Sequence, residues 1–202
     1  ASIFSDESLE KRIQAQLKKI DVRLLSSVFL ITPEGKYEIH LTVRSKKGQC
    51  VTTKELVWNL SKVVGRKMVL PEGERLLVGQ EYCTIVAMEG PKYHTLQGVA
   101  KIGKGCDKIS GDNFSMMELP GGKHGVILSD GMGSGEKAFQ ESAMVVEMLE
   151  ELLIAGFPKE TAIQMMNTAL VMGREEISFS TIDMSVFDLY NGNCEFVKVG
   201  AS

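Results

Sequence analysis

The sequence lacks the cysteine patterns that mark metal-ribbon and disulfide-rich proteins. Its four cysteines, Cys50, Cys83, Cys106 and Cys194, are widely spaced and form no C-x-x-C pair. This spacing excludes a zinc ribbon and gives no sign of a disulfide framework. It is typical of a reduced, intracellular protein.

The sequence also lacks an excess of basic residues. It has 23 lysines and arginines against 26 aspartates and glutamates, which gives a net charge of −3. Such a balance produces no positive field, and it excludes a large nucleic-acid-binding surface. We therefore expect protein or small-molecule partners and no nucleic acid.

Long apolar runs are missing as well. No run in the 202 residues approaches the roughly 20 residues that span a bilayer, and no signal-peptide pattern precedes the first expected helix. We therefore expect the chain itself to be soluble. Its start without methionine and its end inside a strand pattern suggest a piece of a longer protein.

The first 90 residues carry an α+β pattern. Apolar residues at helical spacing follow Ser5, which can cap a helix. Two runs, residues 24–32 and 36–44, predict a β-hairpin. A capping box at Thr52 predicts a helix that ends near Gly65.

A strand expected over residues 82–88 completes this first layer, and Gly90 with the proline after it marks a domain boundary. Nothing in this part has catalytic spacing. The basic cluster at residues 44–47 fits a solvated turn better than a docking surface. We interpret residues 1–90 as a regulatory or accessory α+β domain.

The second part, residues 91–202, combines strands with a pair of helices. The expected elements are a strand over residues 96–103, helices over residues 136–155 and 158–172, and strands over residues 179–189 and 194–199. The helices carry wide apolar stripes that include several methionines, and methionine-rich surfaces adapt to partners. Core packing against a sheet is the favoured role for each stripe, with partner docking as an open alternative.

Two aspartates lie at the ends of a hairpin expected between residues 114 and 128. Asp112 opens its first strand and Asp130 closes its second, so the two carboxylates should lie close together. Close carboxylates repel each other unless they share a proton or bind a cation. Gly131 favours the cation, because its backbone carbonyl can approach as a further oxygen ligand.

Two alternatives compete with a metal site. Asp-Gly and Gly-Asp-Asn are also common as plain turns and caps. The glycines at 131, 133 and 135 could form a phosphate-binding loop before a helix, but their spacing matches neither established phosphate fingerprint. The sequence therefore favours a hard-oxygen metal site that includes Asp112, Asp130 and Gly131.

Four motifs together resemble the bacterial PP2C-type (PPM) serine/threonine phosphatases. They are SGDNF at residues 110–114, SDGMGSG at 129–135, FSTID at 179–183 and VGAS at 199–202. The resemblance covers roughly residues 93–202, with residues 1–90 in the place of the preceding regulatory region. It implies an α/β/β/α sandwich of antiparallel sheets, here truncated.

The resemblance also implies site roles and chemistry. Asp130 would bridge two Mn²⁺ (or Mg²⁺) ions in the complete domain, Gly131 would add its carbonyl, and Asp112 would serve the second ion directly or through water. A water between the ions would attack the phosphoserine. The family's further metal-binding aspartates lie downstream of Ser202. Asp183 is a weaker candidate, and its family position indicates a structural role.

For partners and location, the resemblance suggests a phosphorylated anti-anti-sigma factor as substrate. It places the chain at the cytoplasmic face of a membrane, anchored by segments outside this sequence. We also expect a homo-oligomer, joined through a sheet edge or through the methionine-rich helices. Two classes of function remain open: a metal-dependent phosphatase, or a catalytically incomplete regulatory or dimerisation module with the same scaffold.

Overall fold

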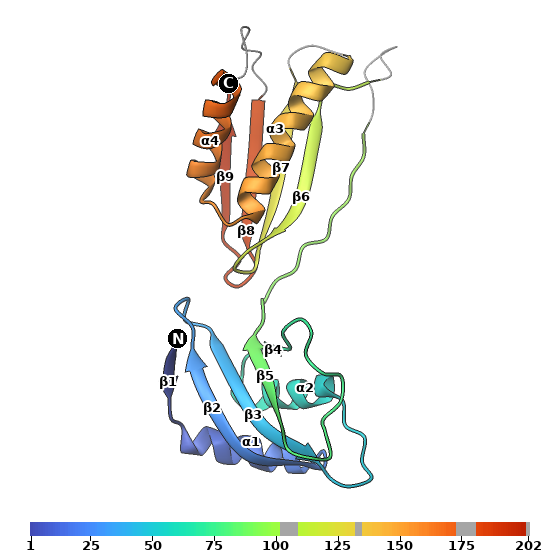
Figure 1. Ribbon diagram of the computed structural model, residues 1–202, viewed down its shortest axis with the longest axis vertical. Coiled ribbons are helices and arrows are strands. Elements are labelled where there is room, and N and C mark those ends of the chain that lie inside the picture. Colours follow the sequence, from blue (N-terminus) through green and yellow to red (C-terminus); the bar gives the residue numbers. More distant parts are fainter. Residues whose placement is uncertain (102–108, 132–134, 173–180, 201–202) are drawn as a thin grey trace. The chain divides into compact units, whose positions relative to one another are not determined.

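A computed structural model, shown in Figure 1, describes residues 1–101, 109–131, 135–172 and 181–200. The chain divides into two compact units, Ala1–Gly90 and Pro91–Ser202. The described residues contain two antiparallel sheets and four helices. This arrangement agrees with the α+β class expected from the sequence.

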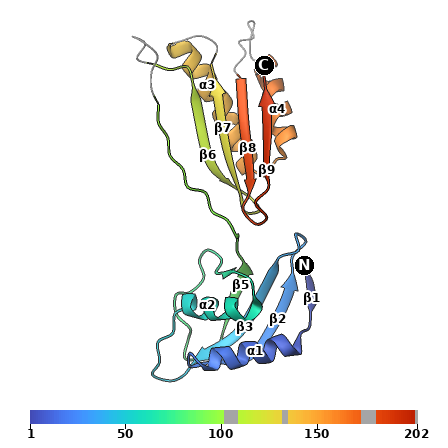
Figure 2. The same ribbon diagram turned by 180° about the vertical axis from the view of Figure 1, so that it is seen from behind.

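The first unit is a five-stranded sheet covered by two helices. Its strands are β1 (Ser2–Phe4), β2 (Val22–Ile31), β3 (Tyr37–Ser45), β4 (Met68–Val69) and β5 (Cys83–Glu89), in the order β1-β2-β3-β5-β4. Its helices are α1 (Glu7–Lys18) and α2 (Thr53–Val64). The helices contact each other on one face of the sheet (Figure 2), and their apolar residues share a buried core with Ile39, Leu41 and Val43 of β3.

Capping residues set the ends of the two helices. The N-cap of α1 is Asp6, whose side chain accepts a hydrogen bond from the Leu9 backbone N–H at 2.9 Å. The expectation of Ser5 as the cap is therefore wrong by one residue, because the carboxylate of Asp6 already satisfies that donor. The Thr52 hydroxyl accepts from the Glu55 N–H at 3.1 Å, as the capping box predicts. Gly65 ends α2 in the left-handed conformation with φ 72°.

The second unit is a four-stranded antiparallel sheet with two helices on one face (Figures 1 and 2). Its elements are β6 (Asn113–Leu119), β7 (Lys123–Asp130), α3 (Glu136–Ile154), α4 (Lys159–Met172), β8 (Thr181–Asp188) and β9 (Cys194–Val199), with the strands in sequence order. No strand forms over residues 96–101, so that expectation is wrong for the described part of this run, and residues 102 and 103 lie outside the described ranges.

The two faces of the second sheet differ in burial. The α3 and α4 face holds the core, in which Ile127, Leu149 and Met184 are almost fully buried. Alternation along the strands places Phe114, Leu128 and Phe196 on the opposite face. These three side chains are 41%, 47% and 74% exposed. Within the described ranges, no helix is long and apolar enough to cross a membrane.

Candidate functional site

The β6–β7 hairpin brings Asp112 and Asp130 together, as the sequence predicts. Asn113 pairs with Ser129 at the open end of the hairpin, so the next residue on each strand is one of the two aspartates. A hydrogen bond with Asp112 is the main cause that raises the pKa of Asp130, and burial and repulsion from Asp112 add to it. Both side chains remain exposed. The pair can therefore share a proton or accept a cation from solvent.

Ser110 and Lys101 hold Asp112 in place. The Ser110 hydroxyl donates to the Asp112 Oδ2 at 3.0 Å, while the Asp112 backbone N–H donates to Ser110 Oγ at 3.2 Å. The Lys101 ammonium donates to the Asp112 backbone carbonyl at 2.9 Å. The sequence showed Ser110 only as part of a motif, and gave no signal for Lys101.

Gly131 occupies a position with no room for a side chain. Its N–H donates to the Gly111 carbonyl at 3.3 Å, which joins the two aspartate turns directly. A Cβ at this position would lie 2.5 Å from the Ala138 carbonyl oxygen and 2.8 Å from that of Gly111. The glycine is therefore required by the close approach of α3, whereas the ligand role of its carbonyl stays a prediction.

Ser142 links helix α3 to the same turn. Its buried hydroxyl donates to the Gly111 carbonyl and accepts from the Asn113 side-chain amide at 2.7 Å. The same amide donates to the Phe139 carbonyl at 2.9 Å. The two residues that flank Asp112 are thus fixed to the first turns of α3.

The residues present fit a cation only in part. Asp112 and Asp130 provide oxygen ligands of the kind that Mg²⁺ and Mn²⁺ prefer. Nowhere in the described ranges do three or more His, Cys, Asp or Glu side chains gather as a metal cluster. An ion held by two carboxylates would keep most of its water shell.

Asp183 lies on β8, where it pairs in register with Leu128 and its carboxylate is 3.3 Å from the Lys198 ammonium. This contact favours the structural role expected for it. Glu118 is exposed near the turn end of the hairpin, far along β6 from Asp112.

Comparisons with known proteins identify relatives of this chain. A model of the family Stage II sporulation protein E (SpoIIE) matches residues 120–202. The chain is 30% identical over 193 residues to stage II sporulation protein E of Priestia megaterium and 28% identical over 193 residues to that of Bacillus subtilis (strain 168). Each alignment covers 96% of this chain, but only 33% and 23% of the two relatives.

A solved structure of the PP2C phosphatase domain and a fragment of the regulatory domain of the cell fate determinant SpoIIE from Bacillus subtilis has a similar fold. The TM-score is 0.56 at 24% sequence identity, with 96% of this chain and 61% of that chain covered. This likeness confirms the resemblance in fold that the motifs indicated.

Proposed function

Because the chain is related in sequence to the stage II sporulation protein E proteins and has the fold of part of a PP2C phosphatase structure, we propose that it contributes to a metal-dependent phosphoprotein phosphatase. In this proposal it supplies the carboxylates of Asp112 and Asp130 to the metal site. The observation that carries the proposal is the placement of the Asp112 and Asp130 carboxyl groups together at the open end of the β6–β7 hairpin.

The two aspartates would hold Mn²⁺ or Mg²⁺, with the Gly131 carbonyl beside them. Bound divalent ions offset the charge of a phosphate group and lower the pKa of a water molecule for attack on phosphorus. The chain's own part is positioning. Ser110 and Lys101 hold the Asp112 turn, and the Gly111–Gly131 hydrogen bond keeps the two turns together.

Asp130→Asn in the longest natural form of the protein tests the proposal. An amide cannot bridge two cations as a carboxylate can, so we expect turnover of a phosphoserine peptide with Mn²⁺ to fall by at least about 100-fold, the scale of losing one essential catalytic group. The matched control is Asp6→Asn, which makes the same chemical change at a helix cap of the first unit. Turnover near wild type in Asp130→Asn would refute the assignment.

The 202-residue chain itself should bind Mn²⁺ weakly and show no useful turnover. The physical reason is the small number of ligands in the described residues. Calorimetric titration of the chain with Mn²⁺, alongside a turnover assay, measures both quantities. Micromolar binding with repeated turnover would show that other residues of this chain complete the site.

A second candidate function is a regulatory or dimerisation module without chemistry of its own. The observation that favours it is the exposed apolar face of the second sheet, with Phe114, Leu128 and Phe196. We expect a homo-oligomer if this face is the interface, and light-scattering mass across a dilution series measures it. Phe196→Glu should then shift the mass towards the monomer.

The substrate and location stay predictions from the resemblance. They are a phosphorylated anti-anti-sigma factor and the cytoplasmic face of a membrane, with the anchor outside this sequence. Incubating the longest natural form with such a phosphorylated protein and following loss of phosphate would test the substrate.

A further inference from the structure

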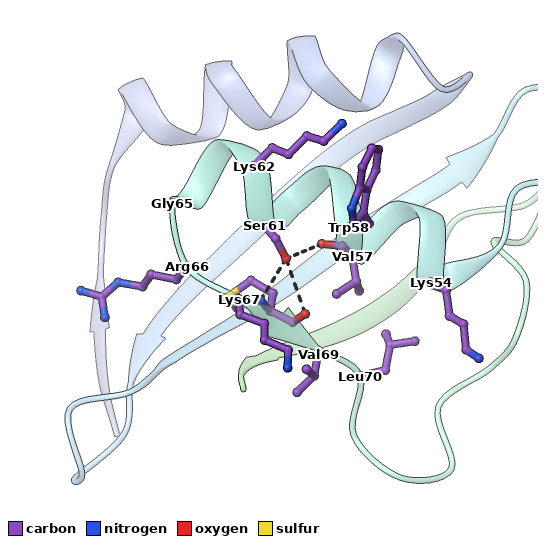
Figure 3. Close-up of a pocket in the computed structure, with 11 residues that line it drawn as sticks. Lys54, Val57, Trp58, Ser61, Lys62, Gly65, Arg66, Lys67, Val69 and Leu70 are labelled. Atoms are coloured by element: carbon purple, nitrogen blue, oxygen red, sulfur yellow. Dashed lines mark hydrogen bonds between the residues drawn. The ribbon is translucent and has the colours of Figure 1, made fainter. Parts of the chain in front are cut away.

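A groove lies between helix α2 and strand β4 of the first unit, far in sequence from the aspartate pair. Figure 3 shows side chains from α2 along one wall and the segment through Val69 and Leu70 along the other. The groove is open to solvent and has a volume of about 730 Å³. We call it the α2–β4 groove.

The floor of the groove is apolar. Val57 and Met68 are buried beneath it, and Val69 and Leu70 are partly buried. On the α2 wall stands Trp58, the single tryptophan of the sequence, with 61% of its surface exposed. Exposed tryptophans beside apolar floors are typical anchors of protein interfaces.

Positive charge surrounds this floor. Lys54, Lys62, Arg66 and Lys67 all line the groove. Arg66 is bound to Glu89, and Lys62 lies 3.1 Å from the centre of the Trp58 ring. Lys54 and Lys67 pair with no carboxylate in the part of the chain that the structure describes. Although the chain has a net charge of −3, the groove is thus locally positive and attracts negatively charged groups.

The hydrogen bonds of Ser61 limit how a partner can bind in the groove. Its hydroxyl accepts from the Met68 backbone N–H at 2.9 Å and donates to the Val57 carbonyl at 2.8 Å (Figure 3). The outward-facing donor of β4 is therefore already satisfied, which disfavours addition of an extended peptide to this strand. A partner has to bind through its side chains, as an amphipathic helix does in a groove.

We propose that the α2–β4 groove binds an acidic amphipathic helix of a protein partner. Apolar side chains of that helix pack on Trp58 and Val69, and its carboxylates face Lys54 and Lys67. A helix fits better than a membrane surface because a flat bilayer does not reach the floor of a concave groove. This inference is independent of the phosphatase proposal.

The test uses the full 202-residue chain and a designed helical peptide of about five turns, with leucines along one face, glutamates beside them and no tryptophan. Since Trp58 is the only tryptophan, its emission reports on the groove directly. We expect a blue shift on titration and a dissociation constant on the order of 10 µM, as for small transient interfaces. Added salt should weaken the binding.

The charge-reversal variant Lys54→Glu with Lys67→Glu should weaken binding about tenfold or more, because like charges then face each other. The matched control is Lys46→Glu with Lys47→Glu, which makes the same charge change at two exposed lysines outside this groove. The control should bind within about twofold of wild type, since distant exposed charges are screened. Thermal melts verify that both variants are folded.

Four results would overturn the proposal. One is the absence of any Trp58 shift at millimolar peptide, and another is an equal loss of binding in both charge variants. The third is a shift with phosphatidylglycerol vesicles but not with peptide, which would assign the groove to membranes. A shift that depends on protein concentration alone would assign it to a second copy of the chain and would also overturn the proposal.

Discussion

Substitution of Gly131 by alanine tests the packing on which the aspartate pair depends. The added Cβ would lie 2.5 Å and 2.8 Å from two backbone oxygens, where ordinary contact begins at 3.4 Å. Both oxygens belong to the main chain, so relief requires movement of α3 or of the Gly111 turn. Overpacking of this kind costs about 1–3 kcal/mol. For a unit of this size, that loss lowers the melting temperature by about 4–12 °C.

Scanning calorimetry of the whole chain provides the assay, because the first unit serves as an internal reference whose transition should not move. Gly98→Ala is the control substitution. Its added Cβ meets nothing within 4 Å and its φ is not in the left-handed region, so it should leave stability within about 0.5 kcal/mol of wild type. If Gly131→Ala is as stable as Gly98→Ala, the contact with α3 does not constrain the turn.

Three further substitutions test other parts of the structure. The pKa of Asp130 is raised, so the folded metal-free chain binds the proton of the Asp130 carboxyl more tightly than the unfolded chain does. The free energy of unfolding should therefore fall as the pH rises from the ordinary carboxyl pKa through the raised pKa. Asp130→Asn should remove that fall in urea midpoints measured across the acidic range, and an unchanged pH dependence would contradict the pairing. Ser142→Ala should cost about 1–3 kcal/mol in urea unfolding, because the buried Gly111 carbonyl loses a donor; a loss below about 0.5 kcal/mol would count against it. Thr52→Ala should lower the melting temperature of the first unit alone, through loss of about 1 kcal/mol from the α2 cap.

Much of the fold follows from local sequence signals. The capping box at Thr52 and the strand run over residues 36–44 each involve residues that are close in the chain, and the structure confirms both. The juxtaposition of Asp112 and Asp130 was also predictable, since a hairpin joins the ends of its two strands. Short-range periodicity and turn chemistry are sufficient for such features.

Other features depend on contacts that no local pattern encodes. The hydrogen bonds from Lys101 to Asp112 and from Ser142 to Gly111 join residues that only the fold brings together. The strand expected from residue 96 does not form in the described residues, because apolar content alone supplies no neighbouring strand to pair with. The two-residue strand β4 is too short to leave a periodic signal.

The two sheets differ in how well their edges resist pairing with another chain. In the first unit, the Met68 N–H is bound by Ser61 and the Val86 N–H by the Glu74 carboxylate at 3.1 Å. Side chains thus occupy donors that would otherwise template intermolecular strand addition, and the carboxylate also repels acidic neighbours. The second sheet ends in the longer strands β6 and β9. In concentrated solution, aggregation of this protein should therefore start from the second unit. The aggregation rate should increase when the backbone edges of β6 and β9 are more exposed to solvent.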